Sequence, residues 1–176
     1  MFEKITQTIR LEIMMSKEGN HRYGLLKSWD KKKPMATIIT IYPGEAETVT
    51  SDLTIMLITN HLYSQNFGGF YSVNLFSKMD IFNKSKRTLA KAYDTTTDEV
   101  IRMCTESSKQ IIFAWGSLPQ TNPIAKRRVD MVIEMLTDQK EKCFFLSNQL
   151  GESCFHPLAS QVRNMWRIIP YKSDNG

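Results

Sequence analysis

The segment at residues 36–42 constrains the fold of this chain more than any other stretch of its sequence. It reads Ala-Thr-Ile-Ile-Thr-Ile-Tyr, is β-branched almost throughout, and ends abruptly at Pro43-Gly44. A strand with one face in water alternates apolar and polar residues, and this run does not. Such strands occur mainly where helices cover both faces of a sheet. The run therefore predicts a fully buried strand in an α/β domain.

Further apolar runs alternate with helical segments along the rest of the chain. Strands are predicted at 71–76, 110–116 and 142–146, and helices at about 52–65, at about 97–108 and from Asn122-Pro123 onward. This alternation implies right-handed crossovers and a parallel sheet. The stretches 9–13 and 22–29 flank turn residues and predict a β-hairpin. We expect an α/β fold: a three-layer domain with a mostly parallel, four-stranded central sheet, helices on both faces and an N-terminal β-hairpin.

Length and composition agree with a single domain. The chain has 176 residues, of which 41% are hydrophobic, and this is enough for a sizeable core. We assign 1–176 to one domain, with the hairpin at 1–30 and the α/β core at 36–166. The polar segment 77–93 is expected to be a surface excursion with little regular structure. No stretch approaches the roughly 18 apolar residues of a membrane span, so we expect a soluble, cytoplasmic protein with no membrane partner.

The cysteine, histidine and glycine patterns indicate no cofactor. Cys104, Cys143 and Cys154 form no CxxC pair, and the 3 histidines show neither HxxxH nor HxH spacing. Because each cysteine adjoins an apolar residue, we expect buried, inert thiols. The chain contains no GxxxxGK[ST], GxGxxG or GxSxG motif. We therefore predict neither a metal site nor a bound cofactor.

The net charge of +5 favours a polyanionic partner such as nucleic acid or a nucleotide. Part of this charge lies in the run Lys31-Lys32-Lys33 before Pro34. A basic run of this length is either a solvated turn or a phosphate contact. We keep Lys32 as a candidate nucleic-acid contact.

The most informative polar residues lie where the predicted strands end. In an open parallel sheet, ligands bind outside the carboxyl ends of the strands, so these exit segments should meet in one cleft. The candidates for substrate binding are Tyr42, Pro43 and Gly44 after the first buried strand, Asn74 in the second, and Trp115 and Gly116 after the third. His156, in the loop after the fourth strand, is a candidate for catalysis.

Each candidate also has a purely structural interpretation. Asn74 lies in an apolar run and either bonds a neighbouring loop or presents a donor and an acceptor to a planar ligand such as a nucleobase. His156 either holds its loop or acts as a hydrogen-bond donor near neutral pH. Glu45 and Asp52 are the nearest carboxylates, and each either caps a helix or activates water.

Taken in order, these landmarks resemble an uncharacterised bacterial and phage family, the domain of unknown function numbered sixteen forty-three. The resemblance runs from about residue 22 to about residue 166. It is carried by Arg22-Tyr23-Gly24-Leu25, Tyr42-Pro43-Gly44-Glu45-Ala46, Ser51-Asp52-Leu53, Gly68-Gly69-Phe70, Val73-Asn74-Leu75-Phe76, Ala114-Trp115-Gly116 and His156-Pro157-Leu158.

A more distant likeness implies a chemical reaction. The order of the motifs is similar to that in the uracil-DNA glycosylase superfamily. It consists of a Pro-Gly turn, an Asn in an apolar strand, a Trp-Gly and a His-Pro. That likeness implies that Asn74 reads a base edge and that His156 stabilises the departing base anion of a cleaved N-glycosidic bond. The water-activating Asp or Asn of the superfamily is replaced here by Tyr42. The DNA-wedging loop after His-Pro is matched only by Gln161, Arg163, Asn164 and Arg167, of which Arg163 and Arg167 are candidate nucleic-acid contacts.

Three hypotheses follow for the function. The first is a glycosylase-like hydrolase that recognises a nucleobase in nucleic acid or in a nucleotide. The second is a non-catalytic binding module for nucleic acid or protein that has kept the cleft, which the residue at Tyr42 favours. The third is a structural α/β domain in which Asn74 and His156 only join loops to the sheet.

Overall fold

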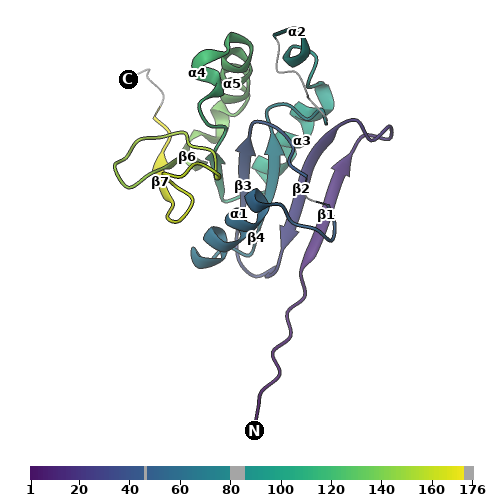
Figure 1. Ribbon diagram of the computed structural model, residues 1–176, viewed down its shortest axis with the longest axis vertical. Coiled ribbons are helices and arrows are strands. Elements are labelled where there is room, and N and C mark those ends of the chain that lie inside the picture. Colours follow the sequence, from purple (N-terminus) through teal and green to yellow (C-terminus); the bar gives the residue numbers. More distant parts are fainter. Residues whose placement is uncertain (46, 80–85, 173–176) are drawn as a thin grey trace.

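A mixed sheet of seven strands, in the order β1-β2-β4-β3-β5-β6-β7, runs through the middle of the computed structural model (Figure 1). The structure describes residues 1–45, 47–79 and 86–172. The strands are β1 (Arg10–Met15), β2 (Arg22–Ser28), β3 (Met35–Thr40), β4 (Gly69–Asn74), β5 (Gln110–Phe113), β6 (Cys143–Ser147) and β7 (Arg167–Pro170).

The prediction of a mostly parallel, four-stranded sheet is wrong. The pairs β3–β4, β3–β5 and β5–β6 are parallel, but β1–β2, β2–β4 and β6–β7 are antiparallel. The N-terminal hairpin does not stand apart, because β2 pairs with β4 and places Gly24 opposite Val73. At the other edge the chain returns along β6 as β7, where Ile168 and Ile169 form too short an apolar run to be recognised in the sequence.

Helices pack against both faces of the sheet. They are α1 (Leu53–Ser64), α2 (Lys86–Leu89), α3 (Thr95–Glu106), α4 (Leu118–Thr121) and α5 (Pro123–Met135), with a 3-10 helix η1 (Thr137–Lys142) before β6. Successive residues of a strand point to opposite faces. Accordingly, Ile39 of β3 packs in one buried cluster with Ile101 of α3 and Val129 of α5, whereas Ile38 packs in a second cluster with Ile58 of α1.

The helix starts agree with the sequence pattern at α5 and differ from it at α3. Asn122 caps α5 as predicted, since its Oδ1 accepts hydrogen bonds from the first-turn amides of Ile124 and Ala125. At α3 the N-cap is Asp94, so the helix begins at Thr95 rather than at about residue 97. Thr97 is the third residue of that helix, and its backbone amide donates to Asp94 Oδ1 at 2.9 Å.

The predicted surface excursion 77–93 is described only in part, because residues 80–85 lie outside the described ranges. Residues 86–89 form the short helix α2. Leu89 and Ala92 are fully buried in the cluster that contains α3 and α5. Leu89 and Ala92 therefore belong to the core, whereas Ala90 and Lys91 between them are exposed as predicted.

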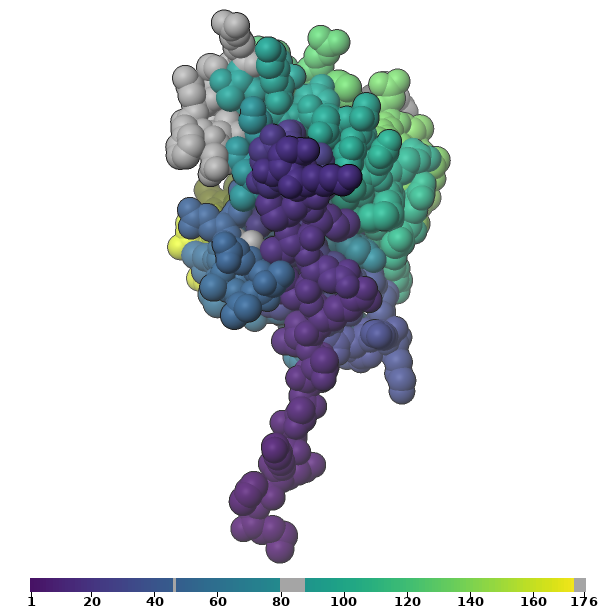
Figure 2. Space-filling view, turned by 90° about the vertical axis from the view of Figure 1, so that its right-hand side faces the viewer, coloured from purple at the N-terminus to yellow at the C-terminus, as the bar shows by residue number. Residues whose placement is uncertain are grey.

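Strand β1 forms one edge of the sheet, and the N-terminal residues extend from it away from the body of the molecule (Figure 2). Nε2 of Gln7 donates to the backbone carbonyl of Trp29 at 2.5 Å. Beyond that contact Met1, Phe2 and Ile5 are exposed. The core of the sheet is therefore built without this segment.

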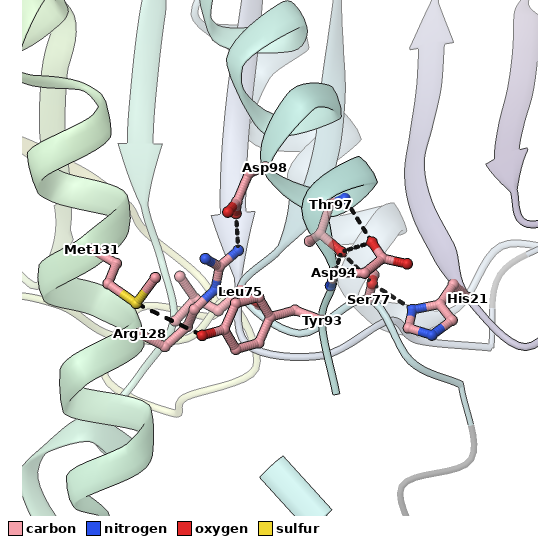
Figure 3. Close-up of polar contacts among 9 residues, drawn as sticks. All are labelled: His21, Leu75, Ser77, Tyr93, Asp94, Thr97, Asp98, Arg128 and Met131. Atoms are coloured by element: carbon pink, nitrogen blue, oxygen red, sulfur yellow. Dashed lines mark hydrogen bonds and ion pairs between the residues drawn. The ribbon is translucent and has the colours of Figure 1, made fainter. Parts of the chain in front are cut away.

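Arg128 of α5 is a fully buried cation that holds the chain just after β4 (Figure 3). Its Nε donates to the carbonyl of Leu75 at 2.8 Å, and its Nη2 contacts Oδ1 of Asp98 at 2.5 Å. The guanidinium carbon also lies 3.9 Å from the ring centroid of Tyr93. A buried charge is tolerated only when it is paired and hydrogen-bonded, and these contacts meet that need.

Ser77 is a second anchor for the same segment (Figure 3). Its buried hydroxyl lies 2.7 Å from Nδ1 of His21 and 2.7 Å from Oγ1 of Thr97. Its carbonyl accepts the amide of Arg22 at 2.8 Å. The chain that leaves β4 is therefore tied to β2, α3 and α5.

We predict that Arg128→Ala lowers the free energy of unfolding by about 3 kcal/mol, because it leaves the carbonyl of Leu75 and the carboxylate of Asp98 without their partner. Urea denaturation measures this loss. Arg127→Ala is the matched control, because Arg127 is an exposed neighbour on the same helix and its loss should change stability by less than about 0.5 kcal/mol. Equal effects of the two substitutions would contradict the anchoring role.

Candidate functional site

A cavity of about 200 Å³ lies at the carboxyl ends of β3 and β4, beside the first turn of α1, and we call it the strand-end cavity. Thr40 and Asn74, the last residues of these parallel strands, are direct partners in the register. Parallel neighbours end at the same edge, so the loop after β3 and the last residue of β4 both line the cavity. Of the sequence-predicted residues, it brings together Tyr42, Pro43, Gly44, Asp52, Asn74 and His156.

Asn74 presents a buried acceptor to the strand-end cavity. Its side chain is only 2% exposed, and Nδ2 donates to Oγ1 of Thr40 at 2.6 Å. Oδ1 accepts no hydrogen bond from any described residue. A buried carbonyl oxygen without a donor costs about 1–3 kcal/mol, and a donor from outside the chain would remove this cost.

His156 contributes a hydrogen-bond donor. Its Nδ1 accepts the backbone amide of Leu158 at 3.2 Å, so the neutral ring carries its proton on Nε2. Burial lowers the pKa of His156 below its usual value, and the carboxylate of Asp52 raises it in part. The Cβ and backbone of His156 lie close to Gly116, whose φ of +76° also leaves little room for a side chain.

Asp52 supplies the carboxylate. It is the N-cap of α1, and its Oδ1 accepts the amide of Ile55 at 2.8 Å. The other oxygen, Oδ2, occupies the space where a Cβ on Gly44 would lie, so only glycine permits this approach. Asp52 also interacts electrostatically with both Arg22 and His156. Asp52 therefore caps α1 and also interacts with the guanidinium of Arg22 and the imidazole of His156.

Sequence reasoning missed Arg22, which also lines the strand-end cavity. It is 4% exposed, and burial lowers the pKa of its guanidinium while Asp52 raises it. Arg22 comes from β2, which reaches the cavity only because it pairs with β4. The available signal was an arginine immediately before the apolar run Tyr23-Gly24-Leu25-Leu26.

Tyr42 gives the cavity an aromatic wall. Its ring stacks on Phe76, with 5.7 Å between the ring centroids. Burial raises the pKa of Tyr42 to about 12, so the phenol stays protonated at neutral pH. Tyr42 can therefore pack against a planar ligand but cannot act as a base there.

Three of the predicted residues lie elsewhere. Glu45 is exposed and does not line the strand-end cavity. Trp115 is buried against Phe113, with ring centroids 4.7 Å apart, and borders a groove beside α5. Gly116 borders that groove and an adjoining cavity that also reaches His156.

The basic residues predicted to contact nucleic acid also lie outside the strand-end cavity. Lys32 precedes β3 and is therefore at the opposite end of that strand. Arg163 donates to the carbonyl of Leu158 at 2.7 and 3.3 Å, and Arg167 donates to the carbonyl of Gln149 at 3.3 Å. The structure does not gather these cations around the cavity.

The cysteines offer no nucleophile. Cys104 and Cys143 are buried as expected, whereas Cys154 is only partly buried. Burial raises the pKa of Cys104 and Cys154 to about 12 and that of Cys143 to about 11. All three therefore remain thiols at neutral pH, and the thiolate is the reactive form.

Comparisons with known proteins identify a family and no relative of known activity. A family model described as a protein of unknown function (DUF1643) matches residues 22–158. Searches of curated proteins and of solved structures return no match. Within the described part of the chain, every helix falls short of the length and apolar character that a membrane span requires. No group of three or more His, Cys, Asp and Glu residues in the same ranges is placed to hold a metal ion.

The lowered pKa of His156 predicts a specific pH dependence of stability. Between its folded pKa and the unfolded value of about 6.5, the unfolded chain binds more protons than the folded one. The free energy of unfolding should therefore fall as the pH is lowered through this window. NMR titration of the His156 ring should give a pKa below about 6.5.

His156→Gln separates this contribution from that of His61, whose pKa is also lowered by burial. In the variant, the free energy of unfolding should fall less as the pH is lowered. His61 should account for part of the decrease that remains. Urea denaturation at several pH values measures both. The same slope in the variant and the parent would show that His156 titrates normally in the folded protein.

Proposed function

The chain belongs to the family of proteins of unknown function DUF1643, and we propose that its strand-end cavity binds a nucleobase. The observation that carries this proposal is Oδ1 of Asn74, a buried acceptor that no described residue satisfies. A ligand N–H that donates to this oxygen removes the cost of about 1–3 kcal/mol of leaving the buried acceptor without a hydrogen bond.

The donors and acceptors of the cavity fit the edge of a nucleobase. Asn74 offers an acceptor, and neutral His156 offers Nε2–H as a donor, both in one cavity. A ligand that matches them has an N–H next to a carbonyl or ring nitrogen on one edge. Uracil and hypoxanthine have such an edge, with a ring N–H beside a carbonyl.

The size and walls of the cavity also favour a single ring system. Its volume of about 200 Å³ lies below the range of about 300–1,000 Å³ that is usual for a complete drug-sized ligand. Tyr42, stacked on Phe76, provides a flat aromatic surface for stacking. These features support binding of a base rather than of a whole nucleotide within this cavity.

The same residues can support hydrolysis of an N-glycosidic bond, which is the reaction we propose. Asp52 would accept a proton from water as the water oxygen bonds to the sugar carbon. The bond from that carbon to the base nitrogen breaks, and its electron pair leaves with the base. Nε2–H of His156 stabilises the resulting anion, and in a dry site such a donor contributes several kcal/mol. Asp52 then gives up the proton that it accepted and the base anion takes one up, so the products are the neutral base and the free sugar.

Binding without cleavage is the second candidate function, and Tyr42 favours it. In the uracil-DNA glycosylase superfamily, to which the sequence pattern suggests a distant likeness, an acid or amide stands at this position. A phenol whose pKa is about 12 cannot take that role at neutral pH. Asp52 is then the one carboxylate of the strand-end cavity among the described residues, and its substitution distinguishes the two functions.

Asn74→Leu should weaken binding of uracil or hypoxanthine by about 1–3 kcal/mol, because it removes the acceptor without opening a void. Isothermal titration measures the affinity. Methylation of the matching N–H, as in 3-methyluracil, should weaken binding to the parent protein in the same way. Asn60→Leu is the matched control, since Asn60 is exposed on α1 and its loss should leave binding unchanged. Equal binding of uracil and 3-methyluracil would contradict base recognition through Asn74.

Asp52→Asn tests the reaction, because asparagine also caps helices and keeps α1 intact. Uridine, inosine and a uracil-containing single strand are incubated with each protein, and released base is measured by chromatography. We expect release by the parent, and a decrease of about a hundredfold or more in the variant. Base binding without any release by the parent would establish the second candidate.

A further inference from the structure

A second cavity, of about 570 Å³, adjoins the strand-end cavity and shares His156 with it. We call it the adjoining cavity. Its walls come from the segment after β5 and from the loop between β6 and β7. The polar residues that line it include Ser117, Gln120, Glu152, Ser153 and Gln161.

The adjoining cavity is polar but has no cation for a phosphate. Among the described residues that line it there is neither lysine nor arginine, and Glu152 brings a negative charge. The groove beyond it contains Lys126, whose Nζ lies 2.9 Å from the carboxylate of Asp130. Nucleic acids are bound chiefly through phosphate contacts to lysine and arginine. This cavity therefore disfavours a phosphate and favours a neutral, hydroxyl-rich group.

Glu152 is held in place by its own loop. Its Oε2 accepts Nδ2 of Asn148 at 2.6 Å, and its amide donates to Oδ1 of Asn148 at 3.0 Å. Its carbonyl accepts the hydroxyl of Ser147 at 2.6 Å. No described residue donates to the other carboxylate oxygen, so a positioned acceptor remains for a ligand. Carboxylates in nucleotide-binding proteins bind sugar hydroxyls in this manner.

We propose that the two cavities together bind a free nucleoside, with the base in the strand-end cavity and the sugar in the adjoining cavity, where Glu152 accepts hydrogen bonds from sugar hydroxyls. This assignment rests on the proposed base recognition and names its substrate class. His156 borders both cavities and thus stands where the bond between base and sugar lies. The substrate is a nucleoside rather than a nucleic-acid strand, because a strand carries a phosphate on each side of the sugar.

The test compares uracil, uridine, uridine 5′-monophosphate and a uracil-containing single strand by isothermal titration, with the hypoxanthine series in parallel. Uridine should bind at least about tenfold more tightly than uracil, and the monophosphate and the strand should bind more weakly than uridine. Glu152→Gln keeps an acceptor for Asn148. This variant should weaken uridine binding by about fivefold or more and leave uracil binding unchanged. It should also reduce the difference in affinity between uridine and uridine 5′-monophosphate.

Glu134→Gln is the matched control, because Glu134 is exposed on α5 and lines neither the two cavities nor the groove beside α5. Uracil binding that depends on Asn74, combined with equal affinity for uracil and uridine, would overturn the nucleoside assignment and leave base recognition standing. Tighter binding of the strand than of uridine would do the same. Absence of binding by any base-containing probe would overturn both proposals.

Discussion

The position of Asn74 depends on the pairing of β4 on both of its edges. On one edge the parallel register with β3 sets Asn74 opposite Thr40, whose hydroxyl then orients the amide. On the other edge the antiparallel register with β2 carries Arg22 to the same end of the sheet. A slip of one residue between β3 and β4 would turn Asn74 away from Thr40, and a slip between β2 and β4 would turn Arg22 away from the cavity. The candidate site is thus a consequence of strand register.

The chain beyond Asn74 is held by buried polar contacts rather than by regular structure. Arg128 binds the carbonyl of Leu75, and Ser77 is bonded to His21 and Thr97. Each of these groups would be costly to bury alone, so the contacts must form together or be lost together. This arrangement gives the segment after β4 one conformation and keeps the wall of the strand-end cavity in place.

Charge is distributed unevenly around the two cavities. The strand-end cavity combines Arg22 and Asp52 with a histidine whose pKa is lowered by burial, so its groups balance one another. The adjoining cavity contains Glu152 and no described cation. The net charge of +5 therefore says little about the ligand, because among the described residues Arg22 is the only lysine or arginine that lines either cavity. Arg163 and Arg167, for example, donate to backbone carbonyls of their own loops.

The sequence by itself determined the local elements. The β-branched run before Pro43 became β3, and Asn122 with Pro123 started α5, because hydrophobic periodicity and capping act within a few residues. The expectation that exit segments converge also identified six residues of the strand-end cavity. Only the tertiary structure decided which strands are neighbours. It joined the hairpin to β4, added β7, brought Arg22 to the cavity and left Trp115 outside it. Strand pairing links residues far apart in the chain, and no local pattern encodes the partner.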